Sequence, residues 1–316
     1  MSYPDGDAVS GSHPRLSALV ARARERAAGQ LPALALVYPG DALALDAAAQ
    51  IQRAALARPV LIGPRELIIR AAAEAGVGAG AFEIIDTGAA ASDAAARACD
   101  LARAGDVQAL MKGSLHTDEL MSAVVNKATG LRGPRRISHA FVFDLPRYPK
   151  LLALADCVVN IAPDLKTKRD IVGNAVTLLQ QLGIAEPLVG IVAAVESVNP
   201  AIPATLDAQA LVALSLQGEW PGAVVEGPFG FDNIISAEAA RIKKMVSRVA
   251  GQADLLLMPD LNAGNMLYKS FNYIGGGDCA GLVLGAAVPI VLTSRADSLQ
   301  SRIASVALAV LTAKPR

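Results

Sequence analysis

Residues with reactive side chains are scarce in this chain of 316 residues, which has only three histidines, three cysteines and one tryptophan. His13 and His139 have no partner at a spacing typical of a base and its nucleophile. Cys99, Cys157 and Cys279 are odd in number and far apart, which fits neither a disulfide framework nor a zinc motif. Each lies in an apolar neighbourhood, so we expect buried, inert thiols and a reducing cytoplasm.

An excess of either charge is also missing, because 29 Lys and Arg balance 29 Asp and Glu. No broad attraction to nucleic acid or to an anionic membrane is therefore expected, and any phosphate site must be a local cluster. No apolar run reaches the roughly 18 residues of a membrane span. The longest candidate, 280–292, is interrupted by Gly285 and Pro289. We expect residues 1–15, which are polar, to form a frayed tail.

Apolar strand patterns and helical patterns alternate along almost the whole chain, which predicts a doubly wound, mainly parallel α/β fold. Ser92 is a plausible helix N-cap, Gly105 a helix stop, and the Gly- and Pro-containing seam at 130–134 the best domain boundary. The predicted strands are 34–38, 59–62, 82–86, 107–111, 137–144, 157–161, 189–195, 223–226, 255–258, 280–283 and 289–293. The predicted helices are 42–56, 65–75, 92–104, 117–129, 168–182, 207–216, 237–249 and 298–312.

A first polar cluster follows the predicted strand 255–258, which Pro259 and Asp260 close. Gly264 and Asn265 then open a helix, and Lys269 lies one turn further on the same face as Asn265. Backbone N–H groups at a helix start, with a cation nearby, suit a phosphate or another anion. A purely structural turn is the alternative interpretation, and Tyr268 points elsewhere, which favours packing.

A second polar cluster, with the sequence MKGSLHT, follows the predicted strand 107–111. Gly113 permits a close backbone approach, and Ser114 and Thr117 add hydroxyls at a helix start, so the segment is a candidate phosphate cradle. Lys112 is either a phosphate ligand or a solvated lysine. For His116, a hydrogen bond within the loop is the commoner role.

A third cluster lies after the predicted strand 289–293, which delivers a hydroxyl and a guanidinium side by side at Ser294 and Arg295. Two further segments have open interpretations. Phe229 and Phe231, in the loop 227–233, either line an apolar pocket or fill the core. Lys166, Lys168 and Arg169 open a helix where cations are unfavourable. Such a cluster sometimes marks an anion site or an oligomer contact, but a solvated face is the commoner case.

Several long motifs in the same order make the chain resemble the phosphate acetyltransferase and phosphate butyryltransferase family. The resemblance runs from about residue 105 to the C-terminus. Within the family, the chain is similar in particular to the transferase module of bifunctional enoyl-CoA hydratase/phosphate acetyltransferase proteins. The motifs that carry it are MKGSLHTDELM, RRISHAFVFDLPRYPK, VNIAPDLKTKRDIV, VESVNP, EGPFGFDN, AGQADLLLMPD, PDLNAGNMLYK and VPIVLTSRADS.

The resemblance implies two α/β domains around a cleft that holds the active site, as in isocitrate and isopropylmalate dehydrogenases. The first domain would comprise residues 1–132 plus 284–316, and the second residues 133–283. It also implies a homodimer that acts on acyl-CoA, phosphate and acyl phosphate. Coenzyme A would be a substrate, with no tightly bound cofactor and no metal.

The resemblance further implies catalytic roles for Ser294, whose hydroxyl would contact the coenzyme A thiol, and for Arg295, which would stabilise the transition state. Acetyl-specific members carry an aspartate six residues after this arginine, where this chain has Ser301. Asp297 is the nearer carboxylate, and it is either the base or the N-cap of the last helix. The phosphate oxygens of the substrate are a third possible proton acceptor, so the base stays open.

An arginine that acetyl-specific members carry in the helix after the Gly-x-x-His segment is also missing here, so the acyl group stays open between acetyl, propionyl and butyryl. By resemblance, Asp260, Gly264, Asn265 and Lys269 bind substrate together with the segment 112–117. We therefore expect acyl transfer between coenzyme A and phosphate. A non-catalytic module that binds acyl-CoA or acyl phosphate is the alternative. A dehydrogenase would need acidic residues converging on a metal, and the sequence has no such set.

Overall fold

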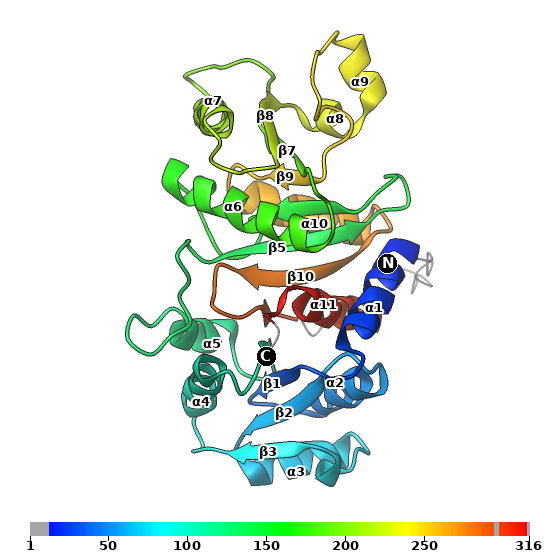
Figure 1. The fold of residues 1–316 in the computed structure, drawn as a ribbon, viewed down its shortest axis with the longest axis vertical. Coiled ribbons are helices and arrows are strands. Elements are labelled where there is room, and N and C mark those ends of the chain that lie inside the picture. Colours follow the sequence, from blue (N-terminus) through cyan, green and yellow to red (C-terminus); the bar gives the residue numbers. More distant parts are fainter. Residues whose placement is uncertain (1–12, 294–296, 315–316) are drawn as a thin grey trace, which may run out of the picture.

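The computed structural model describes residues 13–293 and 297–314. Eleven strands form one sheet in the order β3-β2-β1-β4-β11-β10-β5-β6-β9-β7-β8 (Figure 1). The strands are β1 (Ala33–Val37), β2 (Arg58–Gly63), β3 (Glu83–Asp86), β4 (Ala109–Lys112), β5 (Ser138–Asp144), β6 (Leu152–Ala155), β7 (Leu188–Val192), β8 (Val224–Phe229), β9 (Leu255–Leu257), β10 (Asp278–Leu284) and β11 (Ile290–Val291).

Strand direction divides the sheet into two parallel groups. β1, β2, β3, β4 and β11 are parallel to one another, and so are β6, β7, β8 and β9. Three antiparallel pairings in the middle, β11 with β10, β10 with β5 and β5 with β6, join the groups. The two groups consequently run in opposite directions, and their strands end at opposite edges of the sheet.

Helices cover both faces of the sheet, and the alternation of side chains along each strand decides which core a residue joins. The helices are α1 (Pro14–Ala27), α2 (Ala42–Arg53), α3 (Arg65–Glu74), α4 (Ala91–Ala104), α5 (Thr117–Val124), α6 (Leu165–Gln181), α7 (Pro203–Leu216), α8 (Phe231–Ile235), α9 (Ala237–Ile242), α10 (Leu261–Tyr273) and α11 (Leu299–Thr312). One face forms a continuous core under α1, α2, α3, α6, α7 and α11.

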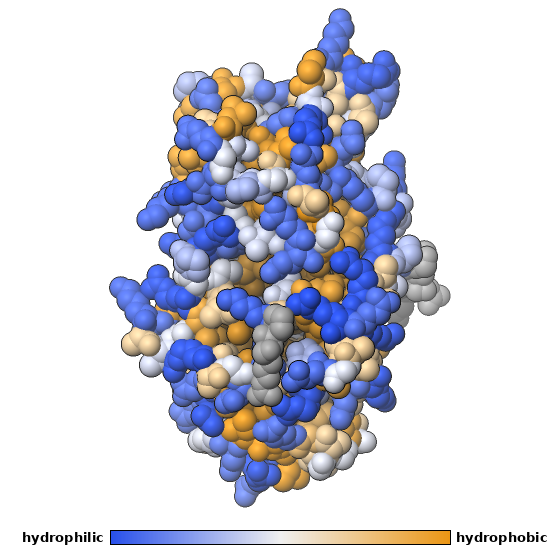
Figure 2. Space-filling model, viewed as in Figure 1, coloured by the Kyte–Doolittle hydropathy of each residue, from blue (hydrophilic) through white to orange (hydrophobic). Residues whose placement is uncertain are grey.

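The core of the opposite face is divided. One cluster lies under α4 and α5, and a second lies under α8, α9 and α10. In β10, Val283 belongs to the first of these clusters and Cys279 to the second, with Gly281 between them. The boundary between the two clusters therefore crosses the centre of the sheet. Polar residues cover most of the face seen in Figure 2, with smaller apolar patches between them.

The alternating α/β pattern predicted from the sequence is confirmed, but several local predictions are wrong. No strand forms at 157–161, because β6 ends at Ala155 and the Asp156 carboxylate then accepts backbone hydrogen bonds from Val158 and Val159. Residues 14 and 15 of the expected tail already belong to α1. The helix predicted at 237–249 ends at Ile242.

Some helix starts also differ from the prediction. Ser92 lies inside α4, which begins after Ala90 without a side-chain cap. α10 begins earlier than predicted, because the Asp260 carboxylate accepts a hydrogen bond from the backbone N–H of Ala263 at 3.0 Å. Gly105 does end α4, with a left-handed φ of 80° that suits glycine.

Candidate active site

The segment after β11 carries the catalytic candidates Ser294 and Arg295, which lie outside the described residues. Asp297, the third candidate, is half-buried. The N-cap of α11 is Ser298, whose hydroxyl accepts a hydrogen bond from the backbone N–H of Ser301 at 2.9 Å. The N-cap alternative for Asp297 is therefore wrong.

A second carboxylate, Asp278 at the start of β10, touches the first turn of α11. The Ser298 hydroxyl donates to Asp278 Oδ2 at 2.9 Å, and the Ser301 hydroxyl contacts Asp278 Oδ1 and lies 2.6 Å from the carbonyl oxygen of Cys279. Ser301 is thus not an isolated replacement for an acid, because a carboxylate from the neighbouring strand adjoins it. The sequence gives no signal for this contact, since Asp278 follows a run of three glycines.

Tyr268 on α10, which the sequence favours as a packing residue, packs and also lies near the candidate site. Its ring stacks on Phe141 of β5 with 4.1 Å between centroids and 1° between ring planes. Burial raises the pKa of the Tyr268 hydroxyl, and the nearby Cys279 and Asp297 raise it further. The Tyr268 hydroxyl is therefore near enough to Asp297 for the charge of that carboxylate to act on it.

The segment 112–117 is held by the end of β1. The backbone N–H groups of Gly113 and Ser114 donate to the carbonyls of Val37 and Tyr38, both at 2.9 Å. A Cβ on Gly113 would lie 2.4 Å from the Val37 oxygen, so only glycine allows this approach. Because both amides are already used, they are not free donors for a phosphate.

The side chains of the segment 112–117 differ from one another in their contacts and exposure. Lys112 Nζ donates to the carbonyl oxygens of Gly113 and Leu115, both at 3.2 Å. His116 is the N-cap of α5, and its backbone N–H donates to the Glu119 carboxylate at 2.8 Å. Thr117 is exposed and lines a cavity described below.

The residues around the start of α10 brace the loop that follows β6. A Cβ on Gly264 would lie 2.6 Å from the carbonyl oxygen of Asp156, and Asn265 Nδ2 donates to the carbonyl oxygen of Cys157 at 3.3 Å. Asp260 caps the helix, and Lys269 is exposed. The contacts of Asp260, Gly264 and Asn265 are therefore structural ones.

Strand direction decides at which edge of the sheet each cluster follows its strand. β4 and β11 end at the same edge, so the segments 112–117 and 294–297 follow neighbouring strand ends. β9 runs in the opposite direction, so Asp260 lies at the other edge. α10 then runs back across the divided face, which explains why Tyr268 rather than Asp260 approaches Asp297.

A cavity of about 1140 Å³ lies between α5 and the start of α6. Both of these helical segments are on the left of Figure 1. Four segments line it, and they adjoin strands of both parallel groups of the sheet. The lining residues are Thr117, Asp118, Met121, Val125, Arg132, Gly133, Pro134, Arg135, Arg136, Ile137, Val158, Val159, Asn160, Asp164, Lys166, Thr167 and Asp170.

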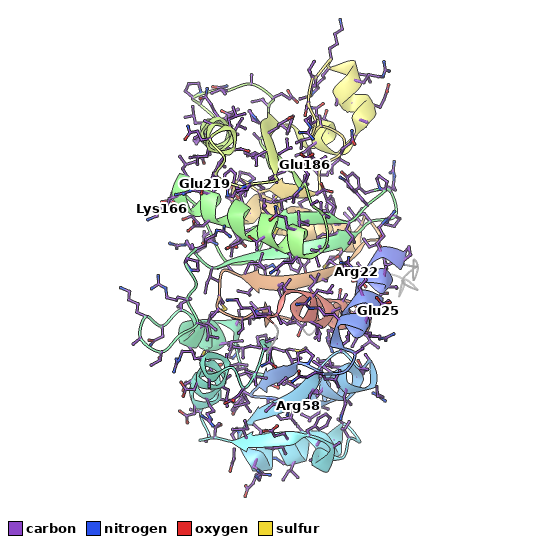
Figure 3. All side chains as sticks on the ribbon, in the orientation of Figure 1. Arg22, Glu25, Arg58, Lys166, Glu186 and Glu219 are labelled. Atoms are coloured by element: carbon purple, nitrogen blue, oxygen red, sulfur yellow. The ribbon has the colours of Figure 1, made fainter. Side chains whose placement is uncertain are left out.

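The basic start of α6 separates into three different environments. Lys168 is buried and bonds Asp207 at 2.6 Å, whereas Arg169 bonds Glu219 at 2.6 Å on the surface. Lys166 is exposed and lines the cavity at the N-terminal end of α6 (Figure 3). Only Lys166 of the three is therefore placed to meet a ligand in this cavity.

Other sequence candidates belong to the core. Phe229 is buried, whereas Phe231 is 40% exposed. All three cysteines are free and buried, and burial raises the pKa of the Cys99 thiol to about 11. His139 is buried, its Nδ1 has no hydrogen-bond partner, and burial lowers its pKa to about 4. In the described part of the chain, no group of three His, Cys, Asp or Glu side chains is arranged to hold a metal.

Comparisons with known proteins agree with the family resemblance of the sequence motifs. The family model described as "Phosphate acetyl/butaryl transferase" matches residues 88–310. A phosphate acetyltransferase of Rhizobium meliloti is 49% identical over 299 residues, which are 94% of this chain and 93% of that protein. A phosphate butyryltransferase of Clostridium acetobutylicum is 37% identical over 90% of this chain and 94% of its own length.

Solved structures are similar over the same length. A branched-chain phosphotransacylase from Enterococcus faecalis V583 superposes with a TM-score of 0.79 and 27% identity, covering 90% of this chain and 100% of that one. A 4-hydroxythreonine-4-phosphate dehydrogenase from Burkholderia phymatum, with a TM-score of 0.55 and 15% identity over 91% of this chain and all of its own, shares the fold alone. The mixed α/β fold and its large sheet thus define a phosphotransacylase-like protein. The chain belongs to the phosphate acetyl/butyryl transferase family.

Across the described helices, none is both long enough and apolar enough to cross a membrane.

Proposed function

We propose that this chain catalyses the reaction acyl-CoA + phosphate ⇌ acyl phosphate + coenzyme A. The family match over residues 88–310, together with 49% identity to a phosphate acetyltransferase over nearly the whole chain, carries this conclusion. The chain is thus an enzyme, a phosphate acyltransferase, and coenzyme A is its substrate. No observation favours a non-catalytic binding module. Relatives named for acetyl and for butyryl groups leave the acyl chain open.

The mechanism that we propose is direct attack in a ternary complex. In the direction of thioester synthesis, the coenzyme A sulfur attacks the carbonyl carbon of acyl phosphate, the carbon–sulfur bond forms, and the carbon–oxygen bond to phosphate breaks. We assign positioning of the thiol to Ser294 and stabilisation of the developing oxyanion to Arg295. The thiol proton passes to a carboxylate or to the departing phosphate.

We propose Asp297 as the carboxylate that takes this proton. Its support is its position two residues after Arg295 and its charge, which acts on Tyr268 and Cys279. Asp278 is a poorer base, because two serine hydroxyls of the α11 start already engage its oxygens. In the direction of thioester synthesis, Asp297→Asn should flatten the acidic limb expected in the pH profile of kcat/KM, whereas Asp278→Asn should mainly lower stability. The reverse result would transfer the role of base to Asp278.

Substrate contacts are proposed for Lys112 and Thr117, whose side chains lie where β4 ends and α5 begins. Gly113 and Ser114 would shape this wall through their bonds to β1. Asp260, Gly264 and Asn265 would act by holding the loop after β6, and Lys269 by its charge. Residues next to both groups of parallel strands line the cavity, which supports an active site in a cleft between two lobes, one for each group.

We propose that these lobes are domains formed by residues 1–132 plus 284–316 and by residues 133–283, related to those of isocitrate and isopropylmalate dehydrogenases. The change of strand direction and the divided core support this boundary. α11 crosses it, because this helix packs on β10. A homodimer and a cytoplasmic location, where the three thiols would stay reduced, complete the proposal. Light scattering would measure the mass in solution.

Release of coenzyme A from acetyl-, propionyl- and butyryl-CoA, with and without phosphate, tests the function. We expect phosphate-dependent thiol release, and the preferred chain length would identify the acyl group. A folded protein that binds acyl-CoA but releases no thiol under any of these conditions would instead be a binding module.

A further inference from the structure

One face of α10 lies against the start of β10. Only the four residues 274–277 connect the end of this helix to the first residue of the strand. Asn272 Nδ2 lies 4.0 Å from Cys279 Sγ, so the last turns of α10 contact β10 directly. Tyr268 is four residues before Asn272 and therefore lies on the same face of the helix.

The start of β10 also holds the segment that carries Asp297. The carbonyl oxygen of Cys279 lies 2.6 Å from the Ser301 hydroxyl, and Asp278 accepts a hydrogen bond from the Ser298 hydroxyl at 2.9 Å. Asp297 directly precedes Ser298. The face of α10 that carries the Tyr268 hydroxyl and the residue just before α11 thus adjoin the same two residues of β10.

The ring of Tyr268 is fixed, and its hydroxyl has a proton to donate. Stacking on Phe141, with 4.1 Å between centroids and 1° between planes, holds the ring. Burial raises the pKa of Tyr268, so the hydroxyl stays protonated at neutral pH, while a hydrogen bond from the Asn272 side chain opposes that increase. A hydrogen bond that stabilises the phenolate is donated to its oxygen, so the hydroxyl proton remains for another acceptor.

We propose that Tyr268 is a positioning residue whose hydroxyl donates a hydrogen bond to the Asp297 carboxylate and orients it for the coenzyme A thiol. This role rests on the proposed function, in which Asp297 is the base. A carboxylate that accepts a hydrogen bond is stabilised in its ionised form, which is the form that can take the thiol proton. Asp278 is the poorer acceptor, because serine hydroxyls of α11 already engage both of its oxygens.

Other titratable and charged groups lie on the elements packed around this pair. They are Asp278 and Cys279 of β10, Asp144 of β5, Lys112 of β4, Cys157 after β6, Lys269 and Tyr273 of α10, Arg15 of α1, and Arg302 of α11. Tyr268→Phe leaves all of them in place and keeps the stacked ring. A change in the titration of Asp297 in this variant therefore reports the loss of the hydroxyl.

The kinetic test is the pH profile of kcat/KM in the direction of thioester synthesis. We expect the acidic limb to move upward by about one pH unit in Tyr268→Phe, so that kcat/KM below this limb falls about tenfold. Tyr273→Phe removes a hydroxyl from a side chain of the same helix that is 78% exposed, and this matched control should leave the limb unchanged. An unmoved limb in folded Tyr268→Phe, or an equal movement in the control, would overturn the proposal.

A carbon-13 NMR titration of the aspartate carboxyl groups needs no turnover and separates this role from the proposed function. The Asp297 signal is identified by its loss in Asp297→Asn. It should titrate about one pH unit higher in Tyr268→Phe than in the wild type. An unchanged titration would refute the hydrogen bond even in an active transferase. A shifted titration with an unmoved kinetic limb would remove Asp297 from the role of base, and with it the positioning role of Tyr268.

Discussion

The buried carboxylate of Asp156 should determine the conformation of the loop that forms one wall of the cavity. Asp156 is 2% exposed, and its Oδ1 accepts from the backbone N–H groups of Val158 and Val159 at 2.8 and 3.0 Å. Its Oδ2 accepts from Asn160 Nδ2 at 2.7 Å and, at 3.3 Å, from the backbone N–H groups of His139 and Asn160. Asp156→Asn retains one acceptor oxygen and turns the other into a donor.

The magnitude follows from these contacts. The substitution loses the short bond from Asn160 Nδ2, and a hydrogen bond to a charged group contributes about 1.5–3 kcal/mol. Two longer bonds are lost with it, and their donors then face an NH₂ group inside the protein. We expect the free energy of unfolding to fall by about 3–5 kcal/mol, comparable to breaking a buried charged interaction. KM for coenzyme A should also rise, because Val158, Val159 and Asn160 line the cavity.

Guanidinium denaturation followed by circular dichroism measures the stability, and steady-state kinetics measures KM. Asp118→Asn is the matched control, since Asp118 is an exposed carboxylate of the same cavity. That variant should change stability by no more than about 0.5 kcal/mol. A loss below about 1 kcal/mol in Asp156→Asn would show that the carboxylate does not hold the loop.

Three further predictions concern catalysis and pH. Arg295→Ala should lower kcat by about 10²–10³-fold with a smaller effect on KM, and Arg295→Lys should recover part of the rate; near wild-type turnover in folded Arg295→Ala would contradict this role. If Arg295 supplies the positive field as proposed, EDTA should leave turnover unchanged, and a loss that Mg²⁺ reverses would refute that mechanism. Burial lowers the pKa of His139 to about 4, whereas an unfolded chain takes up this proton near pH 6.5. Stability should therefore fall as pH drops from about 6.5 to 4, by at most about 3 kcal/mol, and His139→Gln should lose this component in denaturation curves measured across that range; equal slopes would contradict it.

The sequence predicted the fold where local pattern and tertiary structure agree. Buried parallel strands such as β1 and β2 appear as short apolar runs between glycine or proline breaks, and Gly105 ends its helix as expected. The apolar run at 157–161 was misread as a strand because hydrophobicity alone does not reveal that Asp156 would turn the chain. A carboxylate that accepts several backbone hydrogen bonds looks like any other aspartate in a sequence.

The site was predictable only in part, since contacts between distant segments decide it. The glycine of the segment 112–117 was correctly read as a point of close backbone approach, but its amide donates to Val37 rather than standing free. The contacts of Asp278 with Ser301, and the approach of Tyr268 to Asp297, depend on strand order and direction. The three antiparallel pairings that reverse the strand direction between the two groups have no local signature in the sequence.

Capture of the acyl phosphate product tests the central claim most directly. Purified protein, acetyl-CoA or butyryl-CoA and phosphate are incubated with hydroxylamine, which converts acyl phosphate into a hydroxamate, and the released coenzyme A is measured in the same sample. Controls without enzyme correct for direct reaction of the thioester. We expect hydroxamate equal in amount to the thiol released, with both products dependent on phosphate. Thiol release without phosphate and without hydroxamate above the controls would reveal thioester hydrolysis and would contradict phosphate acyl transfer.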